Sequence, residues 1–222
     1  MKLARLFALP LALAAAACAA RRAPETAKED AVPPAPPARS AEADRLVSIF
    51  PDVTLLLEDG TPLRFYEDVL RGKNVIVSFT YTTCTGSCVG TNERLGEVRD
   101  ALGDRVGRDV FIYSVSLDPE ADTPAVLREF AAAHGAGPGT GWRFLTGSKD
   151  GVERVRRSLG VEDPDPVVDA DRTQHAAILV FGSEPLGKWS SIATRAPKEE
   201  ILRSFERVTR PPRRPAGAGT AR

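Results

Sequence analysis

Two continuous apolar segments dominate the middle of the chain. Residues 74–81 (NVIVSFTY) and 110–117 (VFIYSVSL) are rich in β-branched and aromatic side chains, as expected for strands that are buried on both faces of a sheet. Between them, residues 88–102 carry apolar side chains at helical spacing, and Gly103 follows as a typical helix-ending residue. The order strand, helix, strand predicts a parallel sheet.

The rest of the pattern continues this alternation. Asp122-Thr123-Pro124 supplies an N-cap and a first-turn proline for a helix that runs to Ala133. The other predicted elements are a hairpin (53–57 and 63–65), a short strand (142–145), a helix (148–159), a strand (175–181), its hairpin partner (188–192) and a closing amphipathic helix (197–208). We therefore predict one α/β domain over residues 45–209. Its expected fold is thioredoxin-like, with an N-terminal β-hairpin extension and a central mixed sheet flanked by helices.

The N-terminal segment has the pattern of an export signal. Lys2 and Arg5 precede an apolar run over residues 6–17 that ends at Cys18. This run is shorter than the roughly 20 residues that a membrane-spanning helix needs. Residues 13–18 (LAAAAC) resemble a bacterial lipoprotein signal, which predicts a signal peptide over residues 1–17 and a lipid on Cys18. An ordinary signal peptide and an uncleaved anchor are the alternatives, and all three place the domain outside the cytoplasm, in the periplasm or on the cell exterior.

The two ends of the chain carry no periodic apolar pattern. Residues 18–44 contain five prolines and are predicted to form a tether between the membrane anchor and the domain. Residues 210–222 are basic and rich in glycine and proline, which predicts a disordered tail.

The overall charge is balanced but unevenly distributed. The chain has 30 basic and 30 acidic residues, 42% hydrophobic and 27% charged residues, which is an ordinary globular composition and a poor one for binding nucleic acid. The six basic residues at the two ends leave the region from Cys18 to Val208 with 24 basic and 30 acidic residues. The folded body is therefore acidic.

Three cysteines cannot all pair with one another. With Cys18 assigned to the anchor, Cys84 and Cys88 remain as a pair where the first buried strand meets a helix. If both were helical, their Cβ atoms would lie about 5–6 Å apart on one face, so that both sulfurs could share one ion. The start of a helix also favours a thiolate. A Cys84–Cys88 disulfide, predicted for the oxidised form, would require the loop to deviate from a regular turn, which Gly86 permits. A purely structural disulfide and two inert thiols are the alternatives.

One histidine stands at the start of a predicted strand. His175 follows an acidic segment that contains Glu162, Asp163, Asp165, Asp169 and Asp171. A single histidine is most often structural, but the loops of adjacent strands in an α/β sheet meet at one edge, where ligands bind. Two thiolates and an imidazole form a soft ligand set that suits copper, especially Cu(I), and can also hold Cu(II) or Zn(II). The acidic segment is expected to be solvated, or to form a docking or ion-attracting surface beside His175.

The motifs resemble the Sco/SenC family of copper chaperones. The resemblance rests on residues 79–88 (FTYTTCTGSC), on residues 116–124 (SLDPEADTP), on Leu145-Thr146-Gly147 and on His175. It covers residues 45–208 in consistent order and spacing.

This resemblance implies a function and a site. Members are thioredoxin-like and membrane-anchored, and bind copper through two cysteines and a histidine that fall on Cys84, Cys88 and His175. They deliver copper to the dinuclear copper site of cytochrome c oxidase, or reduce its cysteines. Asp118 falls on a recurrent acid of the family. The chain departs from the family at three positions: Thr85 and Val89 stand where proline is usual, and Gln174 where aspartate is common.

Two functions remain open at this stage. A metallochaperone would pass copper to a client, the copper-site subunit of cytochrome c oxidase or another cuproprotein, by ligand exchange. A dedicated thiol–disulfide oxidoreductase would instead attack a client disulfide with Cys84 and resolve the mixed disulfide with Cys88. A peroxidase of the peroxiredoxin type is disfavoured. Val77 stands where its motif has proline, and Tyr81 where it has threonine or serine.

Overall fold

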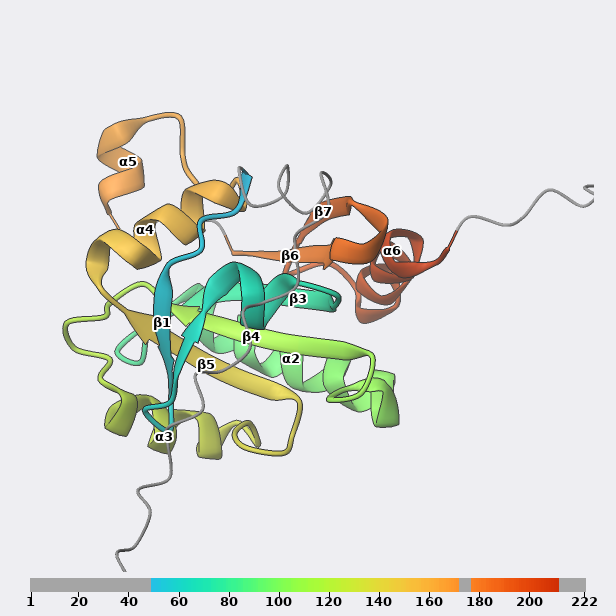
Figure 1. Ribbon diagram of the computed structural model, residues 1–222, viewed down its shortest axis with the longest axis horizontal. Coiled ribbons are helices and arrows are strands. Elements are labelled where there is room, and N and C mark those ends of the chain that lie inside the picture. Colours follow the sequence, from blue (N-terminus) through green and yellow to red (C-terminus); the bar gives the residue numbers. More distant parts are fainter. Residues whose placement is uncertain (1–48, 172–176, 212–222) are drawn as a thin grey trace, which may run out of the picture. The chain divides into compact units, whose positions relative to one another are not determined.

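Seven strands form one mixed sheet in the computed structural model of the protein, which describes residues 49–171 and 177–211 (Figure 1). The strands are β1 (Thr54–Leu57), β2 (Pro62–Arg64), β3 (Asn74–Thr80), β4 (Val110–Ser116), β5 (Trp142–Gly147), β6 (Ile178–Ser183) and β7 (Lys188–Ala193). The helices are α2 (Ser87–Leu102), α3 (Pro124–Ala133), α4 (Lys149–Ser158), α5 (Pro166–Ala170) and α6 (Lys198–Thr209). Short turns of helix cover Phe65–Leu70, Gly103–Arg105 and Glu184–Leu186.

The strand order places the two longest predicted strands at the centre of the sheet. The order is β2-β1-β5-β4-β3-β6-β7. Strands β3, β4 and β5 are parallel, whereas β6 pairs with β3, and β1 with β5, in antiparallel fashion. The carboxyl ends of β3 and β4 and the amino end of β6 therefore lie along one edge of the sheet. This edge carries the residues that follow β3, including both cysteines of the pair.

Alternating residues of the central strands face two separate cores. Val75, Val77 and Phe79 of β3 pack with Val152 and Val155 of α4 on one face. On the opposite face, Ile76 of β3 and Ile112 of β4 belong to a second core. The helices contribute Leu95 of α2, Leu127 of α3 and Phe205 of α6 to it. This two-sided burial explains why β3 and β4 read as continuous apolar segments.

The structure confirms the predicted fold class and most element positions. The described elements that were not predicted include a π-helical turn, Phe65–Leu70, the short helix Gly103–Arg105 and the short helix α5. The expected strand over residues 63–65 is wrong at its end, because Phe65 is buried with Tyr66, Val69 and Leu70 in that π-helical turn. The predicted strand over residues 175–181 is observed as β6, whereas His175 itself lies outside the described residues. Residues 1–48 and 212–222, with the expected signal, tether, lipidated Cys18 and most of the tail, also lie outside them.

Within residues 49–171 and 177–211, no helix is both long enough and apolar enough to cross a membrane.

Candidate functional site

The two cysteines of the pair belong to different local structures. Strand β3 ends at Thr80, and a turn follows that is closed by a hydrogen bond from the Cys84 backbone N–H to the Tyr81 carbonyl oxygen, 3.2 Å away. Helix α2 begins at Ser87, so Cys88 lies in its first turn and Cys84 lies before it. The two cysteines therefore do not share one helix face, and the departure from the helical conformation occurs at Gly86 (φ −107°, ψ −126°), the residue that the sequence offered for it.

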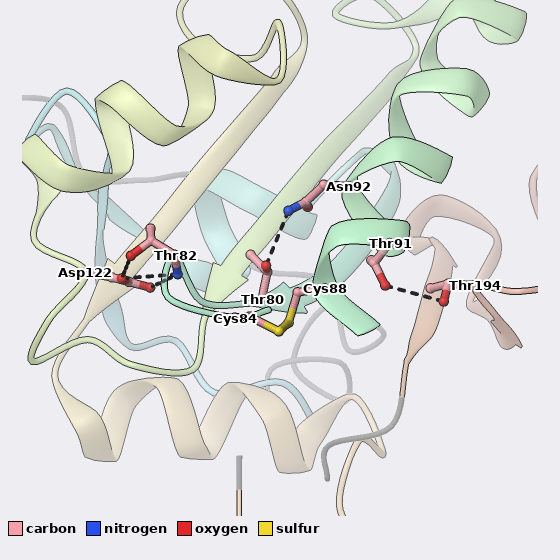
Figure 2. Close-up of a disulfide and its surroundings, with 8 residues drawn as sticks. All are labelled: Thr80, Thr82, Cys84, Cys88, Thr91, Asn92, Asp122 and Thr194. Atoms are coloured by element: carbon pink, nitrogen blue, oxygen red, sulfur yellow. Dashed lines mark hydrogen bonds between the residues drawn. A yellow bond between two sulfur atoms is a disulfide. The ribbon is translucent and has the colours of Figure 1, made fainter. Parts of the chain in front are cut away.

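Cys84 and Cys88 form a disulfide (Figure 2). Their Cα atoms lie 6.0 Å apart, which is within the usual range for a disulfide. Cys88 is 1% exposed, whereas Cys84 is only half-buried. The pair therefore has a buried sulfur on the helix and a more accessible sulfur on the preceding turn.

The start of α2 offers a favourable environment for negative charge on sulfur. Among the described residues, no side chain caps the helix at Gly86, and the first turn of α2 contains no acidic residue. The backbone N–H groups and the helix dipole at this end of α2 therefore favour a negative charge nearby, without a competing carboxylate from that turn. A thiolate at Cys88 would be stabilised by this arrangement once the disulfide is reduced.

A buried carboxylate supports the turn that carries Cys84. Asp122 is 0% exposed and lies on the loop between β4 and α3. It accepts hydrogen bonds from the Thr82 hydroxyl (2.5 Å), from the Thr82 backbone N–H (3.2 and 3.3 Å to its two oxygens) and from the Ser116 hydroxyl (2.6 Å). Figure 2 shows the Thr82 side chain pointing toward Asp122 at the end of β3. Two neighbouring strand ends are thus joined through one side chain.

A second group of polar side chains lies around the first turns of α2. The Asn92 amide nitrogen lies 3.5 Å from the Thr80 hydroxyl, and the Thr91 hydroxyl donates to the Thr194 hydroxyl at 3.3 Å (Figure 2). The Asn92 carbonyl oxygen is buried and has no hydrogen-bond partner among the described residues. These contacts fix α2 against β3 on one side and against the segment after β7 on the other.

Ala177, which precedes β6, lies in this same region. The Thr194 backbone N–H donates to the Ala177 carbonyl oxygen at 2.9 Å. Ala177 and Thr194 line a surface hollow of about 410 Å³ together with residues of α2, namely Gly90, Glu93, Arg94 and Glu97, and with Arg195. The structure therefore places Ala177 beside α2, but it does not test the predicted ligand His175, which lies outside the described residues.

Part of the acidic segment is a structural element rather than a solvated loop. Asp169 of α5 forms two hydrogen bonds of 2.5 Å with the buried Arg156 of α4 and accepts another from the Asp163 backbone N–H. Hydrogen bonding to Arg156 lowers the pKa of Asp169 to about 2. Asp165 caps α5 through the Val167 backbone N–H. The expected solvation of the segment is therefore wrong for Asp169, whereas Asp165 is exposed as expected.

The role of Asp122 was not predicted from the sequence, although a signal for it was present. The sequence suggested Asp122 only as part of a helix cap, and the structure assigns the capping bond of α3 to Thr123. Ser116 and Thr80 are polar residues at the ends of two largely apolar strands, and both are fully buried. Such residues need hydrogen-bond partners, which points to a polar cluster at this edge.

Among the described residues, no group of three or more His, Cys, Asp and Glu side chains could hold a metal ion. The family model described as SCO1/SenC matches residues 48–210. The chain belongs to the SCO1/SenC family.

Other SCO1/SenC proteins share this fold and parts of this sequence. The chain is 32% identical over 124 residues to Protein SCO1 homolog 1, mitochondrial, of Arabidopsis thaliana, a match that covers 52% of this chain and 35% of the length of that protein. Bradyrhizobium japonicum ScoI, whose structure was solved with copper bound, is 25% identical, with a TM-score of 0.54 over 69% of this chain and 95% of that one. BsSco, a Sco-family cytochrome c oxidase assembly protein with a disulfide switch, is 23% identical, with a TM-score of 0.56 over 71% and 91% of the two chains.

Proposed function

We propose that this SCO1/SenC protein is a metallochaperone that binds copper as cargo through the thiolates of Cys84 and Cys88 and the imidazole of His175. The observation that carries the proposal is the direct meeting of the two sulfurs at the strand–helix junction. Two thiolates and one imidazole are the ligands that Cu(I) prefers among protein side chains. The copper-bound structure of Bradyrhizobium japonicum ScoI supports the choice of metal.

The topology of the sheet supports His175 as the third ligand. Strand β6 runs antiparallel to β3, with Val180 opposite Val77 and Ser183 opposite Asn74, so β6 enters the sheet where β3 leaves it. His175 comes two residues before Ala177, and two residues span at most about 7 Å. Ala177 lies beside α2, the helix that carries Cys88, and this supports the proposal that His175 is the third ligand.

Copper binding requires that the disulfide first be reduced. A reductant supplies two electrons and two protons to the Cys84–Cys88 bond and yields two thiols, which lose their protons as they bind the metal. Cargo then passes to a client by exchange of one sulfur ligand at a time, beginning with the more accessible Cys84. Following the family, we propose that the client is the copper-site subunit of cytochrome c oxidase or another cuproprotein. We also propose that a lipid on Cys18 holds the domain at a membrane surface outside the cytoplasm.

Titration of the reduced full chain with Cu(I) against a chromophoric chelator tests the proposal. A Cys18→Ser background leaves Cys84 and Cys88 as the only cysteines. We expect one copper per chain, and a loss of affinity in His175→Ala of at least about 100-fold, the upper range seen for loss of even an outer-shell partner. The matched control is His134→Ala, because His134 is the other histidine and lies at the end of α3 with its Nδ1 atom 2.9 Å from the Phe130 carbonyl oxygen. Equal affinity in His175→Ala and wild type would refute the ligand set.

One observation favours a second function, that of a dedicated thiol–disulfide oxidoreductase. The unequal burial of Cys84 and Cys88 is the arrangement expected of an attacking and a resolving thiol. In that reaction the Cys84 thiolate attacks a client disulfide and releases one client thiolate. Cys88 then attacks the mixed disulfide and releases the second. A client that accumulates as a mixed disulfide with Cys88→Ser, and not with Cys84→Ser, would favour this function; the absence of any exchange with oxidised client peptides would exclude it.

A further inference from the structure

We infer that Asp122 is a positioning residue that holds the Cys84 sulfur close to Cys88 in both the reduced and the oxidised protein, and thereby sets how readily the disulfide forms. The inference rests on the proposed function of the cysteine pair. It follows from the way in which one buried carboxylate fixes the turn between Tyr81 and Cys84.

Asp122 holds the corner of that turn at two points. Thr82 is the first residue inside the turn, and both its backbone N–H and its hydroxyl donate to Asp122. The opposite oxygen of Asp122 also accepts from the Ser116 hydroxyl at the end of β4. Hydrogen bonds to an ionised acceptor are stronger than those between neutral groups. The turn is therefore bound to the neighbouring strand end as well as closed on itself.

Asp122 is itself fixed by its own loop. Its backbone N–H donates to the Asp118 carbonyl oxygen at 2.8 Å, and the Asp118 backbone N–H donates to the Ser116 hydroxyl at 3.0 Å. The carboxylate is fully buried, so water cannot easily replace its donors. Asp122 is thus held by its own loop and bonded to Thr82, so that it links the turn firmly to the end of β4.

This link bears on the chemistry because Cys84 and Cys88 are positioned independently. Cys88 is held by α2, whereas Cys84 depends on the turn. Oxidation removes two electrons and two protons from the two thiols and forms the sulfur–sulfur bond, while a disulfide reagent accepts both and becomes a dithiol. A turn that already keeps the thiols close reduces the conformational entropy lost in this step. Without the link, the reduced state gains freedom and the disulfide becomes easier to reduce.

Two substitutions separate this positioning role from a simple effect of charge. Asp122→Asn is nearly isosteric, but its amide group presents N–H donors where the carboxylate accepts. Thr82→Ala removes the hydroxyl bond and leaves the charge of Asp122 in place. Asp104→Asn is the matched control, because Asp104 is exposed and lies at the far end of α2, in the short helix Gly103–Arg105.

The experiment equilibrates each full-length variant, in the Cys18→Ser background, with mixtures of reduced and oxidised dithiothreitol and traps the free thiols. We expect Asp122→Asn to shift the equilibrium toward the reduced form by on the order of tenfold, or about 30 mV, and Thr82→Ala to shift it less in the same direction. Asp104→Asn should match the wild type. No shift in Thr82→Ala, or equal potentials in all variants, would overturn the inference.

The readout requires no copper and includes a control for folding. A wild-type chain that bound no copper would refute the proposed function without altering these potentials. If Asp122→Asn does not fold, as judged by its circular dichroism, Thr82→Ala decides the result alone: a shift toward the reduced form supports the positioning role, and no shift overturns it.

Discussion

Cys84 and Cys88 lie only four residues apart but in different environments. Cys88 is buried in the first turn of α2, and Cys84 is half-buried on a turn that Asp122 supports through Thr82. A metal held by this pair would therefore have one sulfur fixed by a helix and one that a client can approach. Transfer of cargo and exchange of disulfides both require such an accessible sulfur.

The difference in burial predicts a difference in reactivity. In the Cys18→Ser background, Cys88→Ser leaves Cys84 as the single thiol and Cys84→Ser leaves Cys88. We expect iodoacetamide to alkylate Cys84 several times faster than Cys88 in the folded protein, because Cys88 is 1% exposed. The rates can be followed by mass spectrometry, and in denaturant they should become equal. Equal rates in the folded state would contradict the assigned roles.

At the scale of elements, α4 and α5 form a unit that precedes His175 in the chain. Arg156 of α4 donates hydrogen bonds to Asp169, to Glu153 and to the Val161 carbonyl oxygen. Since α5 ends at Ala170, this pairing fixes the chain just before the residues that carry His175. Asp169 therefore has a structural role that a count of charges does not reveal.

This pairing predicts a pH dependence of stability. Hydrogen bonding to Arg156 lowers the pKa of Asp169 from 3.8 to about 2, so the stabilisation is present above pH about 4 and is lost as the pH falls toward 2. Asp169→Asn should lose about 2 kcal/mol of unfolding free energy at neutral pH and depend less on pH between 4 and 2. Thermal melting across this range measures both effects.

The control for this prediction is Asp150→Asn on the exposed face of α4, where the side chain is 83% exposed. It should retain the wild-type stability and pH profile. Parallel pH profiles for Asp169→Asn and the wild type would show that the Arg156 pair contributes nothing to the acid sensitivity of the fold.

At the scale of the whole molecule, the sequence predicted the fold class because its strongest patterns coincide with the centre of the sheet. Strands β3 and β4 are largely apolar because both of their faces are covered. Residues with two structural options were harder to predict. Residues 65–70 include apolar side chains that are compatible with the end of a strand, but they form a π-helical turn. The short helix α5 begins at a proline within an acidic segment that has no clear helical pattern.

The site was predicted only in part. The cysteine pair follows from its spacing and from the strand that precedes it, and the structure brings the two sulfurs together. Asp122 could not be assigned in the same way, because its partner Thr82 lies 40 residues away in the sequence and is brought beside Ser116 and Asp122 only by the register of β3 and β4. Contacts of this kind depend on tertiary structure rather than on local pattern.

The complete molecule is expected to act as a redox-gated copper carrier. Because the Cys84–Cys88 bond consumes both sulfur ligands, the oxidised chain should take up no more Cu(I) than a Cys84→Ser, Cys88→Ser double variant, whereas the reduced chain should take up one equivalent. Metal analysis after gel filtration compares the three samples. Equal amounts of bound copper in the oxidised and reduced chains would refute this control of copper uptake by the disulfide.

We propose that Cys84, Cys88 and His175 bind one copper ion together. X-ray absorption at the copper edge of the reduced, Cu(I)-loaded full chain tests it most directly. We predict two sulfur ligands and one nitrogen ligand, with the nitrogen contribution lost in His175→Ala and kept in His134→Ala. A copper site with the same nitrogen contribution in His175→Ala, or one without two sulfur ligands in the wild type, would refute this set of copper ligands.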